Sequence, residues 1–379
     1  MCHQFVALLL ALEVLTNVVN AGSLRKVWDF QTRLVAESDA AGEAIAIFNI
    51  GFSRDGSRIA VVVGRSWREE LLLVLNSQSP ESYPQRIDVN PQTWPSRWGT
   101  PNVEWSLSGQ QLLLAGKLVD IHGGKICTTA GTRFVGSNQI AGYQLNPARL
   151  ALFDLECGAV GGWVLAKGDQ IQNWDASPER GILFLKELSY PTNVLLGIAQ
   201  FITEADPTKI IRDLGRWQWQ YGGRLISDHE KVLASARFAE SGKTLCGLRG
   251  EEWHRTIECV SVDSGQTLGA RKGWSNPEIR TTNASSRVVI SEYTRKLDWI
   301  DVRWYTGALR SRVIWDFRSG KTIARWKPKD QKVITGDYGA QSPLANVPQT
   351  RPYLFDISPD GGYIVEGGAG VISLYRIEE

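Results

Sequence analysis

The feature that most constrains this chain is a short motif that recurs along it. The motif is an apolar residue, then Ser-x-Asp-Gly or a relative of it, then an apolar strand. Pro, Asp and Gly supply the backbone angles of a tight turn, and the flanking apolar residues suit strands. Each copy therefore predicts a β-hairpin. Copies begin at Phe52, Trp105, near Val135, and at Ala176, Phe238, Thr282 and Ile357.

A second motif follows the first. It is an apolar strand that ends near Asp, with Gly four residues after the Asp, as in 118–124, 152–158 and 313–320. The segment 260–265 is a variant with Ser261 at the Asp position. Two hairpins per unit give four strands, which is the content of one propeller blade. The copies are about 51 residues apart on average, longer than the ~40–45 residues of a WD40 blade, so we expect insertions.

Over residues 25–379 these motifs resemble those of the WD40 or YVTN-type β-propeller superfamily, and the Ser-Pro-Asp-Gly turns of TolB-like propeller repeats. The resemblance implies an all-β propeller of about seven four-stranded blades, and the spacing also admits six or eight. No blade has the full Gly-His…Trp-Asp signature, although Trp-Asp occurs at 28–29, 315–316 and, in a different strand context, 174–175. A β-sandwich is the alternative fold, but it does not predict a two-part repeat.

The two ends of the chain predict how the ring closes. The chain ends in the apolar strand 371–377, and the segment 26–30 resembles 312–317. We expect the N-terminal segment to complete the last blade, so that residues 22–379 form one propeller domain. Closure would remove the open strand edges that otherwise template aggregation.

Residues 1–21 resemble a secretory signal peptide. An apolar run at 5–19 precedes Val19-Asn20-Ala21, a small-residue cleavage site. The run is shorter than the ~20 residues that span a bilayer. Residues 1–4, before the apolar run, include no Lys or Arg, and Glu13 interrupts the run itself. An amphipathic N-terminal helix is therefore the alternative. The interpretation we follow is export to an extracellular or periplasmic location, with no membrane span.

Four cysteines remain after residue 21: Cys127, Cys157, Cys246 and Cys259. An even number in an exported chain permits disulfides. Cys246 and Cys259 flank the segment 250–253, so a hairpin there would bring them face to face. The alternative is two small buried residues. Cys127 and Cys157 are the remaining pair, and no C-x-x-C spacing suggests zinc.

The sequence contains no local motif for catalysis, and we predict no cofactor, no metal and no enzymatic activity. Gly242-Lys-Thr and Gly320-Lys-Thr lack the earlier glycine of a phosphate-binding loop and fall where hairpin turns are expected. A formal charge of +2 argues against a nucleic-acid partner. Propeller enzymes assemble their sites from scattered residues, so a channel enzyme such as a sugar-lactone hydrolase stays open as an alternative.

Binding is predicted on the face that carries the connections between second and third strands and between blades. Those connections are rich in Trp and Arg, the residue types that often contribute most of the binding energy at protein interfaces. Aromatic side chains such as Trp also stack on sugar rings. We expect a protein- or glycan-binding scaffold, or alternatively a TolB-like periplasmic envelope component. The long connection 327–352 shows no clear strand. The candidate binding residues are Trp67, Arg68, Trp94, Trp98, Trp217, Trp219, Trp253, His254, Trp274, Trp299 and Trp304.

Overall fold

The structure is a computed structural model of the 379-residue chain. It describes residues 23–32, 46–65, 68–80, 84–88, 103–114, 116–122, 126–129, 131–145, 148–164, 170–189, 194–203, 210–220, 224–227, 234–249, 256–272, 278–293, 309–334 and 348–378.

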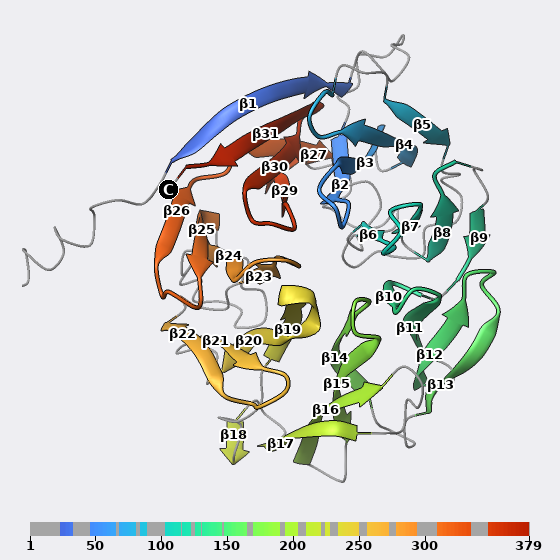
Figure 1. The fold of residues 1–379 in the computed structure, drawn as a ribbon, viewed down its shortest axis with the longest axis vertical. Coiled ribbons are helices and arrows are strands. Elements are labelled where there is room, and N and C mark those ends of the chain that lie inside the picture. Colours follow the sequence, from blue (N-terminus) through green and yellow to red (C-terminus); the bar gives the residue numbers. More distant parts are fainter. Residues whose placement is uncertain are drawn as a thin grey trace, which may run out of the picture.

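Short antiparallel strands form sheets that stand side by side around a central axis (Figure 1). One sheet, in the order β2-β3-β4-β5, comprises Ala46–Phe52, Arg58–Arg65, Arg68–Asn76 and Gln85–Asp88. The next, β6-β7-β8-β9, comprises Glu104–Trp105, Gln111–Leu114, Lys117–Asp120 and Ile126–Thr128. It is followed by β10-β11-β12-β13, which comprises Arg133–Val135, Gln139–Leu145, Ala148–Asp154 and Ala159–Val164.

The sheet β14-β15-β16-β17-β18 comprises Gln170–Ser177, Ile182–Ser189, Val194–Thr203, Ile210–Gln220 and Arg224–Ser227. The sheet β19-β20-β21-β22 comprises Ala234–Ala239, Thr244–Arg249, Thr256–Ser261 and Thr267–Lys272, and a short 3-10 turn, η4, covers Glu240–Gly242. The sheet β23-β24-β25-β26 comprises Glu278–Thr281, Arg287–Tyr293, Leu309–Asp316 and Thr322–Trp326.

The last sheet joins the two ends of the chain. Its order is β29-β30-β31-β1, formed by Leu354–Ile357, Tyr363–Gly368, Val371–Ile377 and Leu24–Gln31. β1 pairs antiparallel with β31, from Leu24 opposite Ile377 to Gln31 opposite Val371. The first described strand is therefore the outermost strand of the last sheet, and the sheets close into a ring.

This arrangement is a β-propeller, and its strand count corrects one expectation. About seven four-stranded blades were predicted; six of the sheets around the axis have four strands, while the sheet of β14 to β18 has five. The physical reason is the length of β17, whose C-terminal end extends far enough to pair Gln218 with Ser227 on β18. Trp217 and Trp219 were expected in a connection between blades, and they lie on β17 instead.

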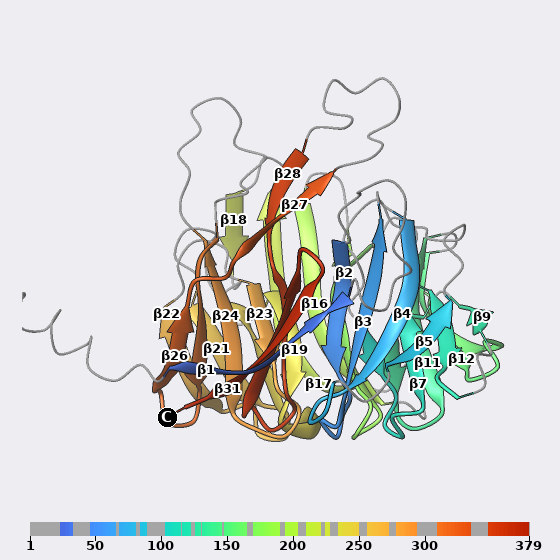
Figure 2. The same ribbon diagram turned by 90° about the horizontal axis from the view of Figure 1, so that it is seen from above.

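The segment 327–352 corrects a second expectation, since it contains strands after all. β27 (Asp330–Ile334) and β28 (Pro348–Pro352) form a separate two-stranded sheet. Prolines at both ends of β28 made a strand hard to foresee, because proline cannot donate to a ladder. Figure 2 shows this hairpin standing out from one face of the ring.

The repeated turn has a common physical basis. In its clearest copies the first serine accepts a hydrogen bond from the backbone N–H five residues later: 2.9 Å for Ser53 and Arg58, and 2.8 Å for Ser358 and Tyr363. The glycine of each turn has a positive φ, 73° at Gly56, which L side chains rarely adopt. The motif is thus a hairpin turn in which Ser fixes the backbone and Gly allows the reversal.

The hydrophobic core lies between neighbouring sheets rather than at the axis. One cluster combines Ile47 and Val61 of the β2–β5 blade with Val365 and Leu374 of the last blade. Another combines Leu72 with Leu112 and Trp105 of the β6–β9 blade. Each fully buried aliphatic side chain contributes roughly 1.5–3 kcal/mol. Because each blade covers its neighbour, the ring must be complete for the core to be covered.

Two disulfides link strands of the ring. Cys246 and Cys259 lie directly opposite each other on β20 and β21 and are bonded, as the hairpin argument predicted. Cys127 on β9 is bonded to Cys157. Cys157 lies in the turn between β12 and β13, so this second disulfide joins two neighbouring blades.

Candidate functional site

The predicted binding residues fall mainly outside the described part of the chain. This holds for Trp67, Trp94, Trp98, Trp253, His254, Trp274, Trp299 and Trp304. Arg68 begins β4 and Trp217 and Trp219 lie on β17, but the side chains of these three are not among those described. The structure therefore places the strands on either side of these residues rather than their side chains.

Those flanking strands define one end of the ring. In an antiparallel blade, connections between second and third strands share an end with connections between blades. Trp67 lies between β3 and β4, Trp253 between β20 and β21, and Trp299 between β24 and β25. The connections between blades hold Trp94, Trp98 and Trp274. We call this end, toward which β27 and β28 project in Figure 2, the upper end.

The lower end has a different composition. It carries the turns between first and second strands and between third and fourth strands. None of these connections in the four-stranded blades contains Trp. Their residues are mostly Ser, Asp, Gly and Arg, which serve the turns. Tryptophan is thus distributed asymmetrically between the two ends of the ring.

A second candidate site lies on the innermost strands, which line the axis in Figure 1. On four of them a charged residue stands two positions before the Ser or Thr of the repeated turn. These residues are Glu104, Asp175, Arg280 and Asp356. The regular spacing was a signal in the sequence, but it predicts a site only once the ring brings the four strands together.

Half of the ring is linked through Asp175. The Arg133 guanidinium lies 3.1 Å from one carboxylate oxygen of Asp175 and 3.8 Å from the Glu104 carboxylate. The backbone N–H of Phe238 donates to the other oxygen of Asp175 over 2.8 Å. These contacts join β6, β10, β14 and β19 in succession, so one carboxylate fastens two blade junctions.

The other half is linked through Asp356. Its carboxylate lies 3.7 Å from the Arg280 guanidinium and accepts a hydrogen bond of 2.8 Å from the backbone N–H of Phe52. Thr281 donates to the carbonyl of Phe238, which joins β23 to β19. The Trp105 indole N–H donates to the carbonyl of Gly51, which joins β6 to β2. Together these contacts link every neighbouring pair of innermost strands, and we call them the inner polar ring.

Arg54 links its own blade to a neighbouring blade and to one that is not a neighbour. It lies in the turn between β2 and β3 and pairs with Glu104 and with Glu179, each over 2.8 Å. Glu179 lies in the turn between β14 and β15, so the arginine connects the β2–β5 blade to the β14–β18 blade. Its side chain is 16% exposed. This contact ties together turns of the lower end.

Burial changes the acid strength of two carboxyl groups in this ring. It raises the pKa of Glu104 above its ordinary value, although Arg54 and Arg133 act to lower it. It raises the pKa of Asp356 as well, against the opposing effect of Arg280 and the N–H of Phe52. Raised carboxyl pKa values occur at functional sites and also in structural ion-pair networks. Since the side chains of the ring contact one another, the structural role accounts for the arrangement.

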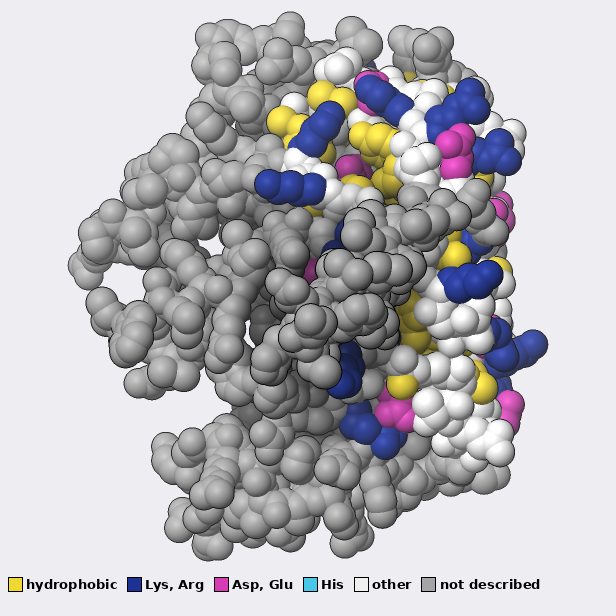
Figure 3. All heavy atoms as spheres, turned by 90° about the vertical axis from the view of Figure 1, so that its left-hand side faces the viewer, with side chains coloured by type: hydrophobic (Ala, Val, Ile, Leu, Met, Phe, Trp, Pro, Cys, Tyr) yellow, Lys and Arg dark blue, Asp and Glu magenta, His cyan; other side chains and the backbone are white. Residues whose placement is uncertain are grey.

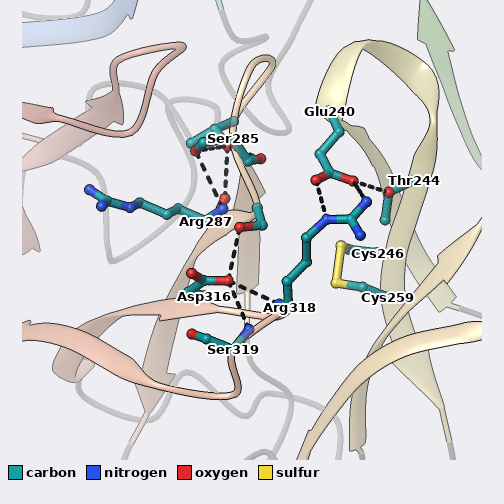
Figure 4. Close-up of polar contacts among 11 residues, drawn as sticks. Glu240, Thr244, Cys246, Cys259, Ser285, Arg287, Asp316, Arg318 and Ser319 are labelled. Atoms are coloured by element: carbon teal, nitrogen blue, oxygen red, sulfur yellow. Dashed lines mark hydrogen bonds and ion pairs between the residues drawn. A yellow bond between two sulfur atoms is a disulfide. The ribbon is translucent and has the colours of Figure 1, made fainter.

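Other turns of the lower end form further links between blades. Arg318, in the turn after β25, donates to both oxygens of Glu240 over 2.6 and 2.7 Å. Thr244 donates to the same carboxylate. Figure 4 shows Arg318 reaching from one blade to Glu240 of the next, close to the Cys246–Cys259 disulfide. A paired, two-pronged contact of this kind fixes the spacing of two turns.

Two kinds of feature are absent among the described residues: clusters of metal ligands and helices that could span a membrane. No group of three or more His, Cys, Asp or Glu side chains is placed to hold a metal ion there. His122 follows β8 in an exposed turn, where its backbone N–H donates to Asp120. In the same part of the chain no helix has the length and apolar character needed to cross a bilayer.

Comparisons with solved structures agree with the fold. The chain is similar to the β-propeller domain of Cps50 (Swd1) from Myceliophteria thermophila, with 14% identity and a TM-score of 0.53, covering 90% of this chain and 100% of that one. An oligogalacturonate lyase in complex with manganese is 12% identical with a TM-score of 0.52, and the match covers 95% of this chain and 99% of that one. Hydrazine synthase of Kuenenia stuttgartiensis is 11% identical with a TM-score of 0.51, and the match covers 90% of this chain and 98% of that one.

These likenesses define the class of fold: the chain is a β-propeller, and the predicted all-β propeller is confirmed. The similar structures include a propeller domain and a lyase, so they leave the activity open. No protein-family model and no curated sequence matches the chain.

Proposed function

We propose that this protein is an exported, non-enzymatic scaffold that binds a protein or glycan partner through the upper end of its ring. The observation that carries the proposal is the asymmetry of tryptophan. Seven tryptophans lie in connections between strand ends of the upper end, and none lies in the turns at the lower end of the four-stranded blades. The propeller fold does not require tryptophan to gather at one end. A binding surface favours tryptophan, because its side chain combines a large contact area with a hydrogen-bond donor.

The chemistry of the axis supports a scaffold. Asp175 and Asp356, on two of the innermost strands, each contact an arginine and a backbone N–H group across blade junctions. A catalytic acid or base must reach a substrate proton. Glu104 and Asp175 are instead held by Arg54 and Arg133, so their role is to fasten blades.

The disulfides support export. Disulfides persist in oxidising compartments and are rare in the cytosol. The pair Cys127 and Cys157 joins two blades, and the pair Cys246 and Cys259 joins two strands. Both are consistent with the signal peptide expected at residues 1–21, which lies outside the described residues.

The test compares both ends of the ring. Full-length protein is cross-linked to the proteins and glycans of the native exported fraction, as wild type and as Trp253→Ala with Trp299→Ala. The matched control is Leu107→Ala with His122→Ala, two exposed residues of the lower end. We expect the upper-end variant to lose the captured partner by at least tenfold while the control keeps it. Equal capture by all three proteins would contradict the proposal.

A channel enzyme is the second candidate, favoured by the raised pKa values of Glu104 and Asp356. It predicts that Glu104→Gln abolishes turnover of a sugar lactone while the fold is kept. Absence of turnover in the wild-type protein with a panel of lactones would remove this candidate.

A further inference from the structure

The outermost strands of three consecutive blades carry an excess of basic side chains. β22, the segment 321–329 that contains β26, and β1 hold eight Lys or Arg and only one acid, Asp29, which gives a formal excess of +7. The whole chain has a net charge of +2, so the remainder is acidic on balance. We call this surface the basic rim. Its members are Arg25, Lys26, Arg271, Lys272, Lys321, Arg325, Lys327 and Lys329.

The opposite side of the ring lacks this excess. The outermost strands there are β5, β9 and β13 (Figure 1). Within their strand bounds they contain one basic residue, Arg86, and one acidic residue, Asp88, whereas β22, β26 and β1 within theirs contain five basic residues and one acid. The charge of the basic rim is therefore a local feature and does not follow from how outer strands are built.

The basic rim is continuous. An Arg271 N–H donates to the Thr322 hydroxyl over 2.7 Å, which links β22 to β26. Leu24 of β1 and Ile323 of β26 pack against the same core cluster. Figure 3 looks onto this side of the molecule, where Lys and Arg side chains recur along the described surface.

Two arginines of the rim are held in place by one buried acid. Glu292 is 4% exposed and lies 3.6 Å from Arg271 and 3.2 Å from Arg325. The Arg325 side chain is nonetheless 44% exposed. One carboxylate thus orients two guanidinium groups and neutralises only one of them, which leaves fixed N–H donors at the surface. Fixed donors lose less entropy when they bind a carboxylate or sulfate.

Three exposed lysines of the basic rim carry charges that are not neutralised within the described part of the protein. Lys272, Lys321 and Lys327 are exposed, and none of them forms an ion pair with a described residue. Lys26 and Arg25, by contrast, lie near Asp29 and Glu378. Like charges on one surface repel each other, so the excess costs stability unless an anion is bound.

We propose that the basic rim binds a linear anionic polysaccharide, one that carries carboxylate or sulfate groups. The rim curves around three blades, so a flexible polymer can follow it, whereas a flat lipid surface would touch only part of it. A polysaccharide is also the polyanion that an exported protein meets, and in this respect the inference rests on the proposed export. It does not depend on the tryptophan-bearing upper end.

The test measures binding of the full chain to heparin and to polygalacturonate by fluorescence anisotropy across a range of salt concentrations. The variant is Lys321→Ser with Lys327→Ser, and the matched control is Arg86→Ser with Lys243→Ser, which removes the same charge elsewhere on the surface. We expect about a tenfold weaker affinity in the rim variant, a smaller salt dependence, and little change in the control. Thermal melting verifies that both variants are folded.

Three results would overturn the proposal. One is no binding of either polysaccharide at physiological salt. Another is an equal loss of affinity in the rim variant and the control. The third is tighter binding to phosphatidylglycerol vesicles or to an oligonucleotide than to both polysaccharides. Because the variants of the upper end leave the basic rim intact, failure here and failure of the scaffold proposal are distinguishable.

Discussion

Single charged residues hold this ring together at its axis. Asp175 contacts Arg133 of one neighbouring blade and the backbone N–H of Phe238 of the other. Asp356 plays the same part between Arg280 and Phe52. Each carboxylate has its cation and its N–H donor, which is the condition under which a buried charge is tolerated. Removing a partner should therefore cost more than a surface ion pair is worth.

Arg54 provides the clearest test at this scale. We expect Arg54→Ala to lower the free energy of unfolding by about 2–4 kcal/mol, because Glu104 and Glu179 would lose the guanidinium that they share. The measurement is the midpoint of urea unfolding. Arg86→Ala, an exposed control, should change the free energy by less than about 0.5 kcal/mol. An equal effect of the two substitutions would show that the contact across the lower end is unimportant.

The Arg318–Glu240 pair should make stability depend on pH. Burial acts to raise the pKa of Glu240, but the hydrogen bonds from Arg318 and Thr244 outweigh it and lower the pKa below its ordinary value of 4.5. A lowered carboxyl pKa contributes stability above pH 4.5, and the contribution is lost as the pH falls through the folded-state value. We expect Arg318→Ala to be less stable than wild type at pH 7, with a difference that shrinks at pH 3. A difference that stays constant with pH would contradict this.

At the scale of elements, the outermost strand β1 contributes both an edge and a core residue. Phe30 is 8% exposed and packs in the cluster shared by the first and last blades, whereas Val27 on the same strand is 50% exposed. We expect Phe30→Ala to cost about 3–5 kcal/mol and Val27→Ala to change little. Guanidinium unfolding of the two variants is the measurement. Similar stabilities would mean that β1 is not packed as described.

The disulfide between β9 and the turn after β12 should matter for the junction of two blades. Replacing Cys127 and Cys157 by Ala should cost about 2–4 kcal/mol and should speed hydrogen exchange in 126–129 and 155–158. The same replacement at Cys246 and Cys259 should affect exchange within its own hairpin and leave that junction unchanged. Exchange that rises equally across both regions would contradict the assignment of separate roles.

Hairpins could be predicted from the sequence, whereas some short strands and the contacts between blades could not. The hairpins were predictable because Ser, Asp and Gly act within a few residues, as at Ser53 to Gly56. The same holds for Cys246 and Cys259, which a single hairpin brings together. β27, β28 and β18 were missed, since pairing decides whether such short segments become strands. The inner polar ring was missed because its contacts join residues such as Asp356 and Phe52, which only ring closure brings together.

At the scale of the whole molecule, closure decides whether any of these parts is stable. Each blade has two apolar faces, and the core clusters lie between blades. A gap at any junction would expose two such faces and two strand edges. The contact of β1 with β31 closes the last gap in the ring, and it depends on the two ends of the chain. The proposed upper binding end and the basic rim both presuppose this closed ring.

Hydrogen exchange of the peptide 24–31 tests that closure most directly. In a closed ring its amides are expected to be protected as well as those of β22 and β26, which are also outermost strands of four-stranded blades. The segment 371–377 is expected to be protected too, because β31 then lies inside its sheet. Exchange of 24–31 within seconds, at the rate of an unfolded chain, would contradict the closed ring.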